Sequence, residues 1–89
     1  TEELKIVGYT WNGTTGIYLK VRNTGTSSLT LSGAEVNNAA PTSQNATGSL
    51  ASNTETTVYI TYGFVSGQKY EFAILTSAGN RYTYTATAP

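Results

Sequence analysis

The chain has 89 residues, no net charge, and neither Cys, Met nor His. That length fits one domain, and a chain this small buries only about 60–65% of the surface that it exposes when unfolded. Residues 1–89 are therefore expected to form a single domain around a thin core, with no room for a large internal active site. The lack of Cys also excludes disulfide bonds, cysteine zinc sites and thiol chemistry.

Hydroxyls and amides, more than charges, make this chain polar. Only 11% of the residues are charged, whereas about 25% is usual, and Thr, Ser and Asn supply the missing polarity. A neutral chain lacks the basic surface that binds a nucleic-acid backbone or an anionic membrane, so neither partner is expected. Cell-surface proteins and filament subunits often have such surfaces, which predicts an extracellular location.

Apolar and polar residues alternate with period two in the first part of the chain, as in half-buried strands. The alternating runs cover residues 4–11, 17–22 and 29–36. Ser32-Gly33 interrupts the third run as a bulge or a kink would. Residues 12–16 and 23–25 separate the runs and carry the Asn and Gly residues that tight turns favour.

Residues 38–53 break this pattern. They contain one Pro, many small residues and amides, and Leu50 as the only large apolar side chain. We expect a long surface loop here, with a short edge strand around residues 48–51 and Leu50 inserted into the core.

Three further alternating runs complete the chain, at residues 57–62, 69–74 and 81–86. Six firm strands and one short strand, at about 8–12-residue spacing, indicate two packed sheets or a small barrel. We predict an all-β, immunoglobulin-like antiparallel β-sandwich of about six to seven strands, with no long helix. The absence of a Cys pair excludes an antibody-type domain.

Little in the sequence supports catalysis. Without His, Cys or Asp, most nucleophile–base pairs and most metal sites are excluded, and no nucleotide-binding motif is present. Of the five Glu, Glu2 and Glu3 lie at an end expected to fray, and Glu71 alternates outward on its strand. Glu35 and Glu55 flank the long loop and are the one pair that could face each other as in a glycosidase. We expect all five to be surface groups, and the protein to be no enzyme and to need no cofactor or metal.

Four aromatic residues occupy positions that the alternation places outward: Tyr9, Trp11, Tyr18 and Tyr59. Exposed rings stack on sugars or pack against protein partners, so these four are candidate contact residues. The alternative is that the rings complete a thin core. In that case the assignment of inward and outward positions along these strands is shifted by one residue.

Two sequons for N-linked glycosylation fall in expected loops. They begin at Asn12 and Asn45, and both are followed by Thr two positions later. Asn and Thr are so abundant here that chance could produce both matches, but their confinement to loops is typical of a glycosylated surface protein.

Two stretches resemble modules of prokaryotic surface proteins. Residues 21–29 resemble the V-x-N-T-G turn of small immunoglobulin-like modules, in which Asn-Thr-Gly closes the second strand and Gly adopts a conformation that other residues resist. Residues 67–72 and 76–82 resemble the C-terminal hairpin of archaeal type IV pilins and their archaellum relatives, and residues 85–89 are similar to the ends of those chains.

That resemblance implies a structural role. Members of the family begin with a cleaved leader and an apolar helix of about 20–25 residues, which forms the filament core and leaves a sandwich outside. No such helix precedes the first strand, so an N-terminal hydrophobic helix is expected to be missing, and contact with a membrane would occur only through it.

The implied function is that of the exposed domain of a type IV pilin-like or archaellum-associated filament protein. It would act by self-assembly, by contacts with other filament subunits or with S-layer protein, and by adhesion. The alternative is a carbohydrate- or protein-binding adhesion module of a larger surface protein.

Overall fold

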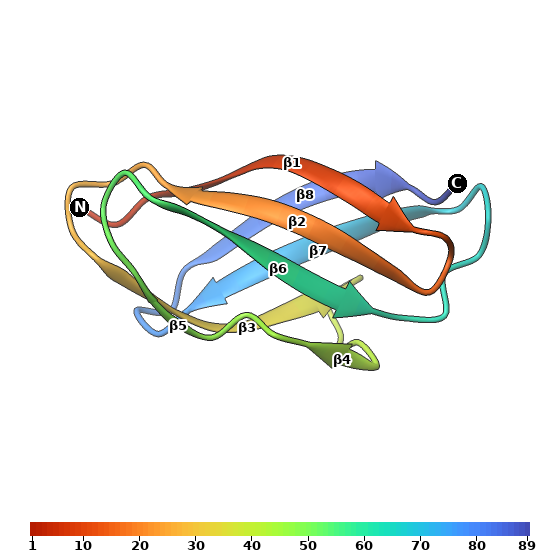
Figure 1. Cartoon of the computed structure of the whole chain (residues 1–89). Coiled ribbons are helices and arrows are strands. Elements are labelled where there is room, and N and C mark those ends of the chain that lie inside the picture. Colours follow the sequence, from red (N-terminus) through yellow and green to blue (C-terminus); the bar gives the residue numbers. More distant parts are fainter.

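The computed structural model describes all 89 residues and contains eight strands and no helix (Figure 1). The strands are β1 (Leu4–Asn12), β2 (Gly16–Asn23), β3 (Leu29–Val36), β4 (Ser43–Gln44), β5 (Gly48–Leu50), β6 (Glu55–Thr61), β7 (Lys69–Thr76) and β8 (Arg81–Thr87). Nowhere does the chain form a helix with the length and hydropathy that crossing a membrane requires.

Two antiparallel sheets pack face to face. The first has the strand order β1-β2-β6-β4 and the second the order β5-β3-β7-β8. The chain changes sheet at each connection from β2 to β7. The long strands β1, β2 and β6 lie in one sheet and β3, β7 and β8 in the other, which is the order of the A, B and E and the C, F and G strands of an immunoglobulin domain. The expected all-β antiparallel sandwich is confirmed.

Alternation along the strands creates the core between the sheets. On β2, every second residue from Ile17 to Val21 is inaccessible to solvent, and each lies opposite a residue of β6. Phe72 and Ile74 of β7 face them from the other sheet and are equally buried. Each such side chain contributes about 1.5–3 kcal/mol relative to an exposed position. A thin core of this kind is what the length of the chain predicts.

The segment 38–53 is more ordered than the sequence indicated. Leu50 enters the core at 6% exposure and pairs with Leu29 at the edge of the second sheet, as expected. The strand β4, which pairs with β6, and the buried Ala46 were not expected. The count of eight strands exceeds the expected six to seven because β4 is only two residues long and leaves no periodic signal.

A buried asparagine organises the turn after β2. The Asn23 amide donates to the carbonyl oxygens of Ser27 and Leu50, both at 2.9 Å, and its Oδ1 accepts from the Gly25 N–H at 2.9 Å. Gly25 does not have a positive φ, contrary to the conformation implied by the resemblance. A glycine is needed there because a Cβ would lie 2.3 Å from the carbonyl oxygen of Thr1.

Candidate contact surface

A β-bulge in β1 decides which way two of the candidate aromatics face. The pairing of β1 with β2 shifts register between Ile6 and Gly8, so that Tyr9 lies opposite Leu19 and Trp11 opposite Ile17. Directly opposite residues of an antiparallel pair share one face of the sheet, and Leu19 and Ile17 face the core. Trp11 is therefore turned inward and packs against the core, so its predicted outward orientation is wrong. Tyr9 shares this face of the strand but stays exposed, as predicted.

Trp11 packs onto the core rather than forming an exposed platform. Its ring lies edge-on to Phe64 and Phe72, with centroids 5.1 and 6.0 Å away. Its indole Nε1 is buried and has no hydrogen-bond partner. The unpartnered N–H has an energetic cost that the aromatic packing must offset.

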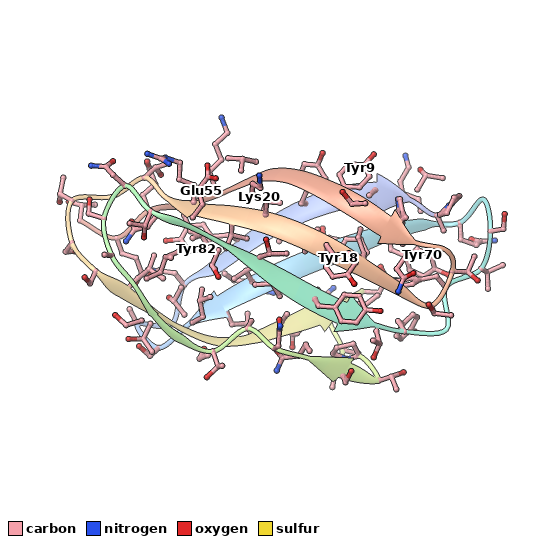
Figure 2. All side chains as sticks on the ribbon, in the orientation of Figure 1. Tyr9, Tyr18, Lys20, Glu55, Tyr70 and Tyr82 are labelled. Carbon is pink, nitrogen blue, oxygen red and sulfur yellow. The ribbon has the colours of Figure 1, made fainter.

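Tyr9 lies at the open side of the sandwich, where β1 passes close to β8 (Figures 1 and 2). Its ring is 5.6 Å from that of Tyr84 on the opposite sheet, and the residue remains 44% exposed. Tyr9 and Tyr84 together cover the gap between the two edge strands.

Tyr18 and Tyr59 lie on the outer face of the first sheet, as the alternation predicted. They are directly opposite each other on β2 and β6, and their rings stack at 4.4 Å with an interplanar angle of 29°. Each ring covers one face of the other. Because of this arrangement, the four candidates do not form a row of coplanar rings of the kind that stacks on sugars.

Beside Tyr18 the surface is hollowed, with a cavity of about 280 Å³ open to solvent. It lies at the bulge, where Gly8 has no side chain to fill the space, and Val7 and Tyr9 form one side of it. Val7, Tyr9 and Tyr18 are three of the four exposed large apolar residues of the domain. Lys20 also lines the hollow and belongs to none of the ion pairs (Figure 2). The surface thus combines apolar contact area with one free positive charge.

Both sequon asparagines are anchored to Tyr59. The Asn12 side-chain N–H donates to the Tyr59 hydroxyl at 3.0 Å, and the Asn45 Oδ1 accepts from the Tyr59 backbone N–H at 2.7 Å. Both asparagines are exposed, as glycan attachment requires. Two segments 33 positions apart therefore meet beside the stacked tyrosines, which the sequence did not indicate.

The glutamates that could have formed a catalytic pair are separated. Glu35 lies on β3 of the second sheet and pairs with Arg81 at 3.4 Å, whereas Glu55 lies on β6 of the first sheet and pairs with Arg22 at 3.5 Å. The two carboxylates are held on different sheets by their own arginines. No group of acidic residues is arranged to hold a metal ion.

Glu2 does not lie at a frayed end, contrary to the prediction. Its Oε1 accepts hydrogen bonds from Thr76, Asn80 and Tyr82, at 2.6, 2.7 and 3.2 Å. These bonds, led by that of Thr76, lower the pKa of the Glu2 carboxyl below its usual range. Burial, reinforced by the charge of Glu2, raises the pKa of Tyr82. The N-terminal segment is thereby fixed to the β7–β8 hairpin.

Solved structures of similar shape were found, although no protein-family model and no curated protein sequence matches the chain. One is the archaellum periplasmic stator protein FlaG from Sulfolobus acidocaldarius, with a TM-score of 0.70 and 17% identity, covering 97% of this chain and 100% of that one. A second is a chain of the archaellum periplasmic stator complex of FlaF and FlaG from the same organism. Its TM-score is 0.70 and its identity 18%, over 93% of this chain and 87% of that one. At these identities the likeness establishes a shared sandwich fold.

Proposed function

We propose that the chain is the exposed structural domain of a cell-surface protein associated with the archaellum, acting through protein–protein contacts. The observation that carries this proposal is the likeness to FlaG over 97% of this chain and the full length of that one. The resemblance of the C-terminal hairpin to archaellum-related proteins, which comes from the sequence alone, points the same way.

The surface supports contact more than chemistry. Its hydroxyl-rich faces carry few charges, and three of the four exposed large apolar side chains gather around one hollow at the β1 bulge. The partner that we propose is another archaellum subunit, because the second structural neighbour is part of a complex of two archaellum proteins. An S-layer protein is a further partner that the sequence resemblance implies.

Localisation and genetics together test this function in the source organism. An antibody against the domain should label cells at the base of the archaellum, and a strain lacking the gene should assemble filaments but swim poorly. Restoring the gene should restore swimming. Labelling elsewhere on the cell, together with normal swimming of the deletion strain, would contradict the proposal.

The second candidate is an adhesion module that binds carbohydrate or protein. The hollow beside Tyr18 favours it, because a recess lined by both apolar and hydroxyl side chains, with the Lys20 ammonium group beside it, can hold a small acidic ligand. A glycan array and a cell-attachment assay distinguish this function from the first. Adhesion that is lost in Tyr18→Ala, in a protein whose deletion leaves motility unchanged, would favour the adhesion module.

Recovery of the native protein tests the expected N-terminal helix and the two sequons together. Intact mass and N-terminal sequencing would reveal an apolar segment of about 20 residues before Thr1. Peptide mapping would show whether Asn12 or Asn45 carries a glycan. An apolar segment supports a filament-anchored subunit, whereas a further folded domain in its place supports the adhesion module.

A further inference from the structure

The four edges of the two sheets differ in how they are protected against pairing with another strand. β1, at the edge of the first sheet, contains the bulge between Ile6 and Gly8, and bulges disrupt the ladder that an added strand would extend. The outer strands β4 and β5 are only two and three residues long. Short or bulged edges are the usual means by which proteins avoid edge-to-edge association.

β8 has none of these features. It pairs with β7 over seven residues, from Arg81 to Thr87, without a register shift. The strand contains no Pro and no Gly, and Arg81 at its start is its only charge. That guanidinium is drawn back over its own sheet by Glu35 and Glu71. β8 is therefore a long, regular and nearly uncharged edge.

The backbone groups of β8 that point away from the domain can be identified from the ladder. The Ala88 N–H donates to the Gln68 carbonyl oxygen, and the Asn80 carbonyl oxygen accepts from the Thr76 N–H. The even-numbered residues of β8 therefore direct their backbone groups toward β7. Since successive residues of an antiparallel strand alternate in direction, Thr83 and Thr85 direct their N–H and C=O groups outward. The side chains of both residues are also exposed.

We propose that the β8 edge binds the β8 edge of a second copy of this chain, joining two sandwiches through one continuous antiparallel sheet. In the register centred on Tyr84, Thr83 of one copy lies opposite Thr85 of the other, and the two Tyr84 side chains meet. Thr–Thr and aromatic cross-strand pairs are favourable. The two Arg81 residues lie at opposite ends, so no like charges are placed face to face.

A second copy fits this edge better than an acidic or basic partner. Residues 82–87 carry no charge that could select such a partner. A second β8 strand, running antiparallel to the first, places threonine hydroxyls opposite threonine hydroxyls and a tyrosine ring opposite a tyrosine ring. The inference goes beyond the proposed function, because it depends on the edge geometry and would hold for any role of the domain.

Charge substitutions at the facing positions test the pairing and its register together. In the double variant Thr83→Lys, Thr85→Lys, each lysine would face a lysine of the other copy, and dimerisation should weaken by about tenfold or more. In Thr83→Glu, Thr85→Lys, each glutamate would face a lysine, and the dimer should be retained. Sedimentation velocity from micromolar to millimolar concentration measures both.

Two controls separate this result from misfolding and from a general charge effect. Circular dichroism melts should show that all variants remain folded, since both threonines are exposed. The variant Thr10→Lys, Thr14→Lys adds the same charge on the other sheet and its hairpin, and should dimerise like the unmodified chain. A chain that is monomeric up to millimolar concentration overturns the proposal. Failure of the Glu–Lys variant to dimerise while the unmodified chain does so overturns the register.

Discussion

Asn23 shows how one polar residue can organise two loops from inside the core. It is inaccessible to solvent, and its side chain satisfies three backbone groups of residues 25, 27 and 50. Its own backbone N–H donates to Thr54, and its carbonyl accepts from Asn53. The turn after β2 is thereby joined to the connection between β5 and β6. The V-x-N-T-G pattern thus has a direct physical explanation in this fold.

Removal of this side chain should be costly. Asn23→Ala would leave two carbonyl oxygens and one N–H without partners, and should lower the free energy of unfolding by about 3–5 kcal/mol. Asn23→Asp keeps the acceptor but places a second oxygen against two carbonyls, and should also destabilise the domain strongly. Urea unfolding followed by circular dichroism measures both. A loss below about 1 kcal/mol for Asn23→Ala would contradict the role assigned to this amide.

Glu2 should make the stability depend on pH in the acid range. Its pKa is lowered in the folded state, so the unfolded chain takes up the proton first as the pH falls. The stabilisation is complete above the ordinary carboxyl pKa of 4.5 and is lost as the pH falls through the lower folded-state pKa. Glu2→Gln should flatten this part of the curve of unfolding free energy against pH.

Thr76→Val provides the matched comparison for Glu2. It removes the hydrogen bond that lowers the pKa of Glu2 most, and should reduce the acid dependence without abolishing it. Urea unfolding at a series of pH values between neutral and acid measures the three proteins. An unchanged curve for Glu2→Gln would show that the N-terminal segment is not held by this carboxylate.

At the scale of elements, the bulge in β1 has the largest effect on the surface. A single extra residue reverses the faces of all residues beyond it, because the side-chain period of a strand is two. Leu4 and Ile6, before the bulge, are buried, and beyond it Trp11 rather than Thr10 packs against the core. The outer face keeps Tyr18 and Tyr59 as its only candidate aromatics.

Trp11 should therefore act as a packing residue. Trp11→Ala would expose part of the cluster around Phe64 and should lower the free energy of unfolding by about 3 kcal/mol. Trp11→Phe keeps most of the ring contacts and removes the unpartnered indole N–H, so its cost should be about 1 kcal/mol or less. Urea unfolding followed by circular dichroism suits both variants, as neither retains a tryptophan. Equal losses for Ala and Phe would contradict the packing argument.

The period-two pattern predicted the six long strands and the buried side chains of β2, β6 and β7, because these strands are regular and have one apolar face. It also predicted the bulge at Gly33, where Ser-Gly visibly breaks the alternation. The bulge at Val7 was not predicted, since Val and Gly both fit an unbroken run.

Long-range contacts explain the other failures of prediction. The hydrogen bonds of Glu2 join residues more than 70 positions apart, and no local pattern contains that information. The same holds for Asn12 and Asn45, whose meeting at Tyr59 depends on how β6 lies between β2 and β4.

For the whole molecule, the scarcity of charge predicts a stability that hardly responds to salt. The three ion pairs join side chains that are between 30% and 45% exposed, and such pairs contribute at most about 1 kcal/mol each. The free energy of unfolding should therefore change by less than about 1 kcal/mol between dilute and molar NaCl. Urea titrations at several salt concentrations measure this, and a change of several kcal/mol would show that the ion pairs act as a network.

The two ends of the chain lie at opposite ends of the sandwich, whose backbone measures 38 Å along its longest axis (Figure 1). β1 and β8 run in the same direction along that axis, so tension applied through the termini would pull the two strands in opposite directions. The hydrogen bonds between β1 and β2 lie across the strands and would be loaded in shear, all at once. Under tension along its long axis, the domain is therefore expected to unfold only when the hydrogen bonds between β1 and β2 break together.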